Sequence, residues 1–168
     1  MKREIESTLF SLDFYSTPAA RTLIFCPTRA EVTRISLLLN GLPYFSDSGT
    51  AEEKKAVISD FFTGKNRFLI STSAFGAGVD YPSIRAIFHV GIPSNLIDFS
   101  QEIGRGGRDL KGCLSKILLP LPLRSKLTTD QKSILDVDKI RMYEYISTET
   151  CRLGILSNYL DAFETTCS

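Results

Sequence analysis

The chain has 168 residues, of which 43% are hydrophobic and 23% charged, so it can bury the core of one globular domain. Its formal net charge of +1 provides no overall basic surface, so any binding of nucleic acid would depend on local groups. The N-terminal residues form no signal peptide, and the longest apolar stretch, "ILLPLPL", is too short to cross a bilayer. These features predict a protein that is neither secreted nor held in a membrane.

From residue 21 onward, short apolar strands alternate with amphipathic helices. The predicted strands are "TLIFC", "PYFS", "RFLIST", "RAIFHVG" and "LSKILLP", at residues 22–26, 43–46, 67–72, 85–91 and 114–120. The alternation predicts an α/β fold, a parallel sheet covered on both faces by helices. In such sheets ligands bind beyond the carboxyl ends of the strands, so we expect the functional residues just after Cys26, Thr72 and Gly91.

Capping residues mark the helices that connect these strands. A hydroxyl side chain at an N-cap accepts a hydrogen bond from a free backbone N–H, and glycine commonly follows the last helical turn. The predicted N-caps are Thr28, Thr50 and Ser94, and the predicted helix ends are Gly41 and Gly64.

The pattern divides the chain into three parts. Residues 1–20 are predicted to be an N-terminal extension, and residues 21–125 the α/β domain. Residues 126–168 contain apolar side chains at helical spacing and predict two short helices.

The stretch "QEIGRGGRD", residues 101–109, places two arginines among three glycines. The guanidinium groups of Arg105 and Arg108 match the geometry of phosphate, and the glycines let a ligand approach closely. A solvated basic loop and an RGG-type nucleic-acid tail are the alternatives. Because the stretch occurs once, inside a globular pattern, a phosphate site is the favoured interpretation.

A second candidate is "STSAFGAGVDYP", residues 71–82, which combines small residues, hydroxyl groups and the carboxylate of Asp80. It is equally consistent with a tight connection after a strand. The chain contains no GxxxxGK[ST] motif and no acidic pair after a strand, so it cannot form a complete site for nucleotide hydrolysis. His89, Cys26 and Cys113 are predicted to be core residues.

Three stretches, "TLIFCPTRAEV", "FLISTSAFGAGVDYPSIRAIFHVGIP" and "SQEIGRGGRD", together resemble motifs IV, V and VI of superfamily 2 helicases, and specifically of the RecQ family. The resemblance runs from about Arg21 to Cys167 and implies the second of two RecA-like lobes. The first lobe, with the P-loop and DExH motif, would be a partner in cis or in trans. Gly106 stands where alanine is usual in motif VI.

The resemblance implies that Arg105 and Arg108 are catalytic arginine fingers, which reach the γ-phosphate of ATP bound with Mg²⁺ on the first lobe. It also implies that Gln101 lies at the interface between the lobes and that Asp109 orients an arginine. The residues on the nucleotide side would be Gln101, Gly104, Asp109, Gly78 and Asp80.

The resemblance also implies a nucleic-acid partner, namely DNA, both single-stranded and at duplex junctions. Thr28, Arg29, Thr72 and Ser73 would contact the phosphate backbone, which carries no sequence information.

The tail resembles the opening of the RecQ zinc-binding subdomain, with Cys151 and Cys167 as the first two of four ligands. Structural zinc needs four ligands, so Zn²⁺ would bind only in a longer chain. The end at Ser168 suggests a fragment or a shortened gene product.

The resemblance implies an ATP-dependent 3′–5′ DNA helicase that is inactive without its first lobe. It also implies a role in DNA repair and recombination, in the nucleus of a eukaryote or otherwise in the cytoplasm. The alternative is a non-catalytic remnant that binds single-stranded nucleic acid or a protein partner. P-loop and DExH motifs in the upstream reading frame would distinguish the two.

Overall fold

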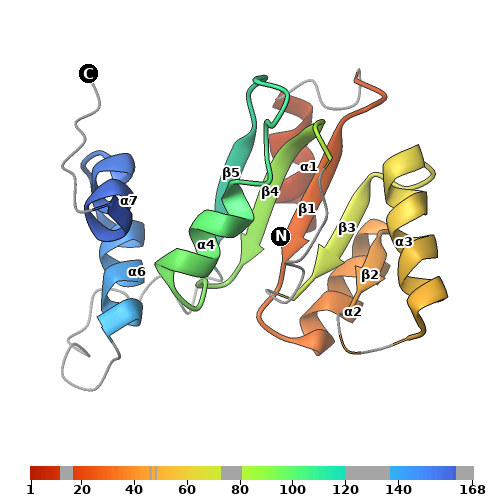
Figure 1. Cartoon of the computed structure of the whole chain (residues 1–168), viewed down its shortest axis with the longest axis horizontal. Helices are drawn as coiled ribbons and strands as arrows, with labels where there is room; N and C mark the ends of the chain where they lie inside the picture. The colour runs from red at the N-terminus through yellow and green to blue at the C-terminus, as the bar shows by residue number, and fades with distance from the viewer. Residues whose placement is uncertain (12–16, 46, 48, 73–80, 120–136, 162–168) are drawn as a thin grey trace.

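A computed structural model shows a five-stranded sheet with helices on both faces (Figure 1). The structure describes residues 1–11, 17–45, 47, 49–72, 81–119 and 137–161. Every strand pairing is parallel, in the order β2-β3-β1-β4-β5. The strands are β1 (Arg21–Phe25), β2 (Leu42–Tyr44), β3 (Phe68–Ser71), β4 (Ile84–Val90) and β5 (Leu114–Leu118). The predicted α/β class is confirmed, and the predicted strand ends differ from the observed ones by at most two residues.

Side chains of the central strand alternate between two apolar cores. Leu23 and Phe25 pack on one face of the sheet, whereas Ile24 and Cys26 pack on the other. The run from Leu23 to Cys26 is apolar at every position because successive side chains point to opposite, equally buried faces.

Helices cover each face of the sheet and extend beyond it (Figure 1). α1 and α2 contribute to the core around Ile24, α3 packs on the opposite face, and α4 packs with α6 and α7. The helices are α1 (Lys2–Ser11), α2 (Arg29–Leu39), α3 (Ala51–Thr63), α4 (Leu96–Ile103), α6 (Val137–Ser147) and α7 (Arg152–Asp161).

The predicted N-terminal extension contributes to the core of the α/β domain. Ile5 and Leu9 of α1 are fully buried and belong to the same cluster as Ile24 and Val32. Residues four apart lie on one face of a helix, so α1 buries a narrow apolar stripe against the sheet.

Two of the three predicted N-caps are confirmed. The hydroxyls of Thr28 and Thr50 accept backbone hydrogen bonds at the starts of α2 and α3. The prediction for α4 is wrong by one residue, because the Oδ1 of Asn95, rather than Ser94, accepts the hydrogen bond from the N–H of Asp98 at 2.7 Å. The helix begins at Leu96, and asparagine is as good an N-cap as serine.

The ends of α2 and α3 both carry a left-handed residue. Gly64 ends α3 as predicted, with a φ of 85°. At the end of α2 the left-handed cap is Asn40, with a φ of 51°, rather than the predicted Gly41. Asparagine adopts this conformation more readily than other side chains do.

Strand β2 forms one edge of the sheet and contains a proline. Pro43 is in register with Ile70 of β3. Proline has no N–H to donate to a neighbouring strand, which confines it to edge positions in sheets.

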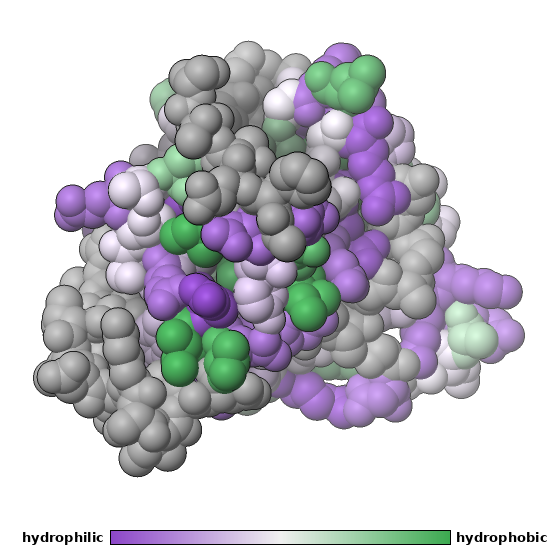
Figure 2. Space-filling model, turned by 60° about the vertical axis from the view of Figure 1, so that its left-hand side comes forward, coloured by the Kyte–Doolittle hydropathy of each residue, from purple (hydrophilic) through white to green (hydrophobic). Residues whose placement is uncertain are grey.

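The two predicted C-terminal helices are present as α6 and α7. Met142 of α6 is fully buried against Leu96 and Phe99 of α4, so the helical tail packs on the domain. The predicted boundary near residue 125 lies outside the described residues. In the part of the chain that is described, no helix is long and apolar enough to span a membrane. On the face that Figure 2 brings forward, hydrophobic side chains form small groups among hydrophilic ones.

Candidate functional site

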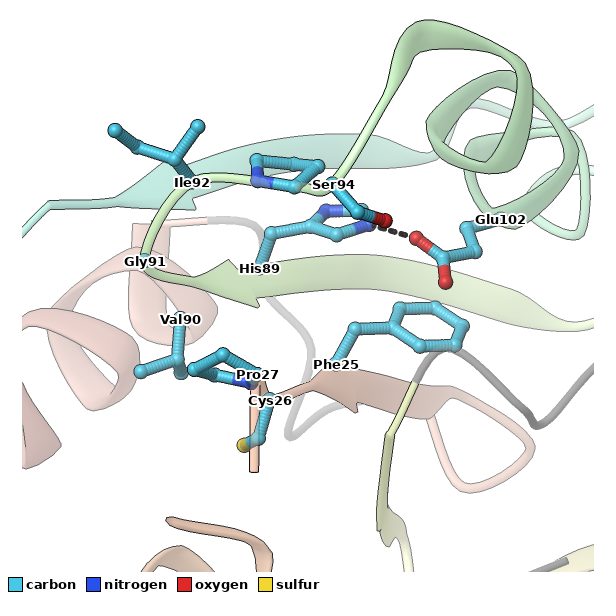
Figure 3. A pocket seen from close by; sticks show the side chains of 10 residues that line it. Phe25, Cys26, Pro27, His89, Val90, Gly91, Ile92, Ser94 and Glu102 are labelled. Atoms are coloured by element: carbon cyan, nitrogen blue, oxygen red, sulfur yellow. Dashed lines mark hydrogen bonds and ion pairs between the residues drawn. The ribbon is translucent and has the colours of Figure 1, made fainter. Parts of the chain in front are cut away.

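A pocket of about 150 Å³ opens between the carboxyl ends of β1 and β4 (Figure 3). Its walls come from Phe25 to Pro27, from His89 to Ser94, and from Glu102 of α4. The chain leaves β1 toward β2 at one edge of the sheet, and leaves β4 toward β5 at the other. The pocket therefore occupies the place where ligands bind in open α/β sheets.

A buried polar pair forms part of this pocket. The Nε2 of His89 and the Oε2 of Glu102 are 2.8 Å apart, and the two residues are only 3% and 6% exposed. The His89 ring stacks on Phe25 with a centroid distance of 5.1 Å and contacts Phe99 at 4.9 Å. His89 is thus the buried residue that the sequence predicts, but sequence reasoning missed its partner Glu102.

Thr28 and Arg29 also lie at the carboxyl ends of the strands, where α2 begins after β1. Thr28 uses its hydroxyl oxygen as the N-cap acceptor, which leaves the hydroxyl proton available for donation. Arg29 pairs with Asp47 at 2.9 Å and lies over the ring of Phe45, 4.7 Å from its centroid. Both charged side chains of this ion pair are more than half exposed, so a phosphate can compete for the guanidinium.

Of the candidates after β3, only Thr72 is described. It is half-buried and follows directly on Ser71, the last residue of β3. Because β3 and β1 are adjacent and parallel, Thr72 and Thr28 leave the sheet at the same edge. The other residues predicted in this segment, Ser73, Gly78 and Asp80, lie outside the described residues.

The loop of Arg105 and Arg108 lies at the opposite end of β4. The N–H of Gly107 donates to the carbonyl of Ile84, the first residue of this strand, at 3.1 Å. β4 has seven residues and is therefore about 20 Å long. The loop therefore does not lie at the carboxyl ends of the strands, where the sequence predicts the functional residues, because α4 carries the chain back along the sheet.

The two arginines differ in exposure. Arg105 is 8% exposed, whereas Arg108 and Gln101 are exposed. Burial, and then the charge of Arg108, lower the pKa of Arg105, but a guanidinium keeps its proton at neutral pH. The Nε of Arg108 donates to the carbonyl of Gly104, the C-cap of α4, at 3.3 Å. The loop thus contains one buried and one solvent-exposed arginine.

Asp109 is fixed by an arginine that sequence reasoning missed. The two terminal nitrogens of the Arg85 guanidinium, Nη1 and Nη2, donate to its carboxylate, and the side chains of Arg85 and Asp109 are 16% and 22% exposed. This bond to Arg85 lowers the pKa of Asp109. The pair joins the arginine loop to the beginning of strand β4, where Arg85 is the second residue, so Asp109 holds the loop in place through Arg85. The only sign of this pair in the sequence was that Arg85 is a charged residue within a mostly apolar stretch.

The Arg85 pair predicts a pH-dependent contribution to stability. Asp109→Asn should lower the free energy of unfolding at pH 7, because it removes a carboxylate whose folded pKa is depressed. The deficit should shrink as the pH falls below about 4, where the carboxylate protonates in the unfolded chain. Urea unfolding at several pH values measures this, with Asp60→Asn in the exposed Lys65 pair as the control. A deficit that is independent of pH would contradict the assignment.

Cys113 packs against the glycines of the same loop. A Cβ on Gly106 would collide with the Sγ of Cys113 and lie 2.9 Å from its Cβ. Burial raises the pKa of Cys113 to about 11 and that of Cys26 to about 12. Both thiols are therefore protonated at neutral pH, as expected of core residues.

Of the two predicted zinc ligands, only Cys151 lies among the described residues. Cys151 is half-buried just before α7, and Cys167 lies outside the described residues. Among the residues that are described, no three His, Cys, Asp or Glu side chains form a cluster that could hold a metal ion. The described residues thus do not fit a structural zinc site, which needs four ligands.

The parallel sheet has the strand order β2-β3-β1-β4-β5, and an arginine-glycine loop follows helix α4. Together these features define a RecA-like helicase lobe. The solved structure of the Mss116p DEAD-box helicase domain 2 bound to an RNA duplex shares this fold, with a TM-score of 0.60 and 20% identity, over 70% of this chain and 47% of that one. The family "Helicase conserved C-terminal domain" matches residues 5–109, so the chain belongs to this family.

Curated relatives confirm the resemblance to RecQ helicases. The ATP-dependent DNA helicase Q-like SIM of Arabidopsis thaliana is 34% identical over 152 residues, which cover 82% of this chain and 17% of that protein. The ATP-dependent DNA helicase RecQ of Haemophilus influenzae is 28% identical over 155 residues, which cover 82% of this chain and 24% of that protein. The chain thus spans about a quarter or less of the length of these relatives.

Proposed function

We propose that this chain supplies the second motor lobe of an ATP-dependent, RecQ-like DNA helicase. The observation that carries the proposal is the loop of Arg105 and Arg108, which α4, β4 and the Arg85–Asp109 pair hold in place. Such a loop can stabilise charge on a phosphate only if its arginines are preorganised. The family match supports this assignment.

In this proposal ATP and Mg²⁺ are bound chiefly by a first lobe, which supplies the P-loop. The nucleotide brings the γ-phosphate whose transfer to water releases energy for movement. On this chain, Arg105 and Arg108 stabilise the negative charge that develops on that phosphate, and Gln101 and Gly104 line the same side. Asp109 keeps the loop against β4 through Arg85.

The nucleic acid binds at the carboxyl ends of the strands, called here the carboxyl edge. This is the end of β4 that lies away from the arginine loop. There Thr28 donates its hydroxyl proton to a backbone phosphate, and Arg29 exchanges Asp47 for another. The free N–H groups at the start of α2 add to the attraction for an anion. Thr72 supplies a further hydroxyl from the position just after β3. Contacts to phosphate alone suit an enzyme that moves along a strand of any sequence, and the direction proposed for this movement is 3′ to 5′.

Reconstitution tests the proposal. Mixed with a separately produced first lobe that contains the P-loop, the chain should restore ATP hydrolysis stimulated by single-stranded DNA. Each lobe alone should be inactive, because only the pair assembles the complete site. Strand separation with a 3′ or a 5′ overhang then gives the direction of movement. A mixture without ATPase activity above the two separate lobes would exclude the proposed role.

Arg29→Ala should weaken binding of single-stranded DNA several-fold and reduce its salt dependence, because one phosphate contact is lost. Fluorescence anisotropy with a labelled oligonucleotide at several salt concentrations measures both effects. The matched control is Arg34→Ala, which removes another exposed arginine of α2, one that pairs with Glu31. Equal affinities for the two variants would place the nucleic acid elsewhere.

A further inference from the structure

The pair of His89 and Glu102 connects the pocket at the carboxyl end of β4 with the arginine loop that follows α4. His89 belongs to the carboxyl end of β4, in the wall of the pocket, whereas Glu102 belongs to α4 (Figure 3). Glu102 lies three residues before Arg105, and its carbonyl accepts the backbone N–H of Arg105 at 3.3 Å. One hydrogen bond between two side chains and one along the backbone therefore connect the pocket to the arginine loop.

The surroundings of the pair leave it little freedom. Phe25 and Phe99 contact the His89 ring, so the ring cannot turn without displacing core side chains. If His89 and Glu102 separate, two buried polar groups are left without a partner, which is costly in an apolar environment. A displacement of His89 is therefore transmitted to α4.

The pair also faces the pocket. The Nδ1 of His89 and the Oε1 of Glu102 are buried and form no hydrogen bond with any described residue. Pro27, which immediately precedes Thr28, lines the same pocket, as do the residues between β4 and α4. Nucleic acid bound at Thr28 and Arg29 therefore lies next to the wall that His89 forms.

We infer that His89 and Glu102 are positioning residues that couple nucleic-acid binding at the carboxyl edge to the placement of Arg105. The inference rests on the proposed function. When a nucleic-acid strand binds beside Pro27, it displaces the pocket wall and, with it, the packed His89 ring. The hydrogen bond to Glu102 then fixes the last turn of α4, and Arg105 is held where it meets the phosphate.

Variants of Glu102 test this coupling in the chain combined with its first lobe. Glu102→Ala removes the hydrogen bond, and Glu102→Leu removes it while filling the space. Each should lower the ratio of ATP turnover with and without DNA about tenfold, whereas Glu102→Gln, whose carbonyl can still accept the His89 proton, should keep most of it. His89→Ala should behave like Glu102→Ala, and the double variant should be no worse than either single one.

A second readout follows from the reciprocity of coupled binding. A non-hydrolysable ATP analogue should change the affinity for a single-stranded oligonucleotide, and the oligonucleotide should change the affinity for the analogue by the same factor. Glu102→Leu should reduce both of these changes equally. Leu9→Ala is the control, because it loosens the core through α1, away from the pair. It should lower the melting temperature while leaving both ratios unchanged.

Three outcomes would overturn the inference. In the first, Glu102→Leu and His89→Ala keep the stimulation ratio of the unaltered protein. In the second, Glu102→Gln loses as much of the ratio as Glu102→Leu does. In the third, Leu9→Ala reduces the ratio equally. The proposed function fails separately, if the reconstituted protein keeps its ATPase activity without Arg105 and Arg108.

Discussion

Arg108→Ala should lower DNA-stimulated ATP turnover by about 10³-fold, which is the effect expected when an arginine that stabilises transferring phosphate is removed. Arg105→Ala should have an effect of similar size. The measurement is kcat and KM for ATP in the presence of the first lobe and saturating single-stranded DNA. Because the charge develops only in the transition state, the loss should appear in kcat far more than in KM.

Two further variants define the role of the guanidinium. Arg108→Lys should remain strongly impaired, because an ammonium lacks the planar fork that contacts two oxygens. Lys111→Ala removes an exposed positive charge close by in the chain and should leave kcat unchanged. If Lys111→Ala were as impaired as Arg108→Ala, the general charge of the loop would matter rather than its arginines.

Gly106→Ala should destabilise the chain by about 1–3 kcal/mol, the usual cost of overpacking a well-packed site. The added methyl group meets both heavy atoms of the Cys113 side chain and lies 3.2 Å from Ile87 Cδ1. Urea or thermal unfolding measures the loss. The same change at Gly112, where a Cβ would meet nothing within 4 Å, is the matched control and should be nearly neutral.

The partner of Gly106 can be tested by a second substitution. Cys113→Ala removes the sulfur but keeps the Cβ, so the double variant should recover part of the stability that Gly106→Ala loses. Additive losses would show that the two residues do not compete for space. In the resemblance to motif VI, Gly106 stands in place of alanine, and Cys113 now accounts for that difference: its side chain fills the space of the missing methyl group.

The features predicted well from the sequence are those that depend on near neighbours in the chain. The N-caps Thr28 and Thr50 and the C-cap Gly64 each act within one helical turn, and the apolar strands need no information about their partners. The helicase lobe could also be predicted, because the order of the three motifs along the chain is typical of the whole domain rather than of one segment. α1 was missed although Ile5 and Leu9 have helical spacing, because two apolar residues give too weak a signal.

The contacts that define the candidate site depend on the tertiary structure. Arg85 and Asp109 are 24 residues apart, and His89 and Glu102 are 13 residues apart. Their meeting depends on how α4 runs back along β4, which no local pattern specifies. For the same reason the arginine loop could be predicted as a phosphate site but not placed at the amino end of its strand.

Pro43 in β2 has a consequence for how copies of this protein behave at high concentration. An exposed strand edge is a template on which another chain can add a strand, and long apolar edges promote aggregation. β2 has only three residues, and the proline removes one of the N–H groups that an added strand would need. The edge formed by β2 is therefore a poor template for β-sheet growth, although the strand beside it is almost entirely apolar.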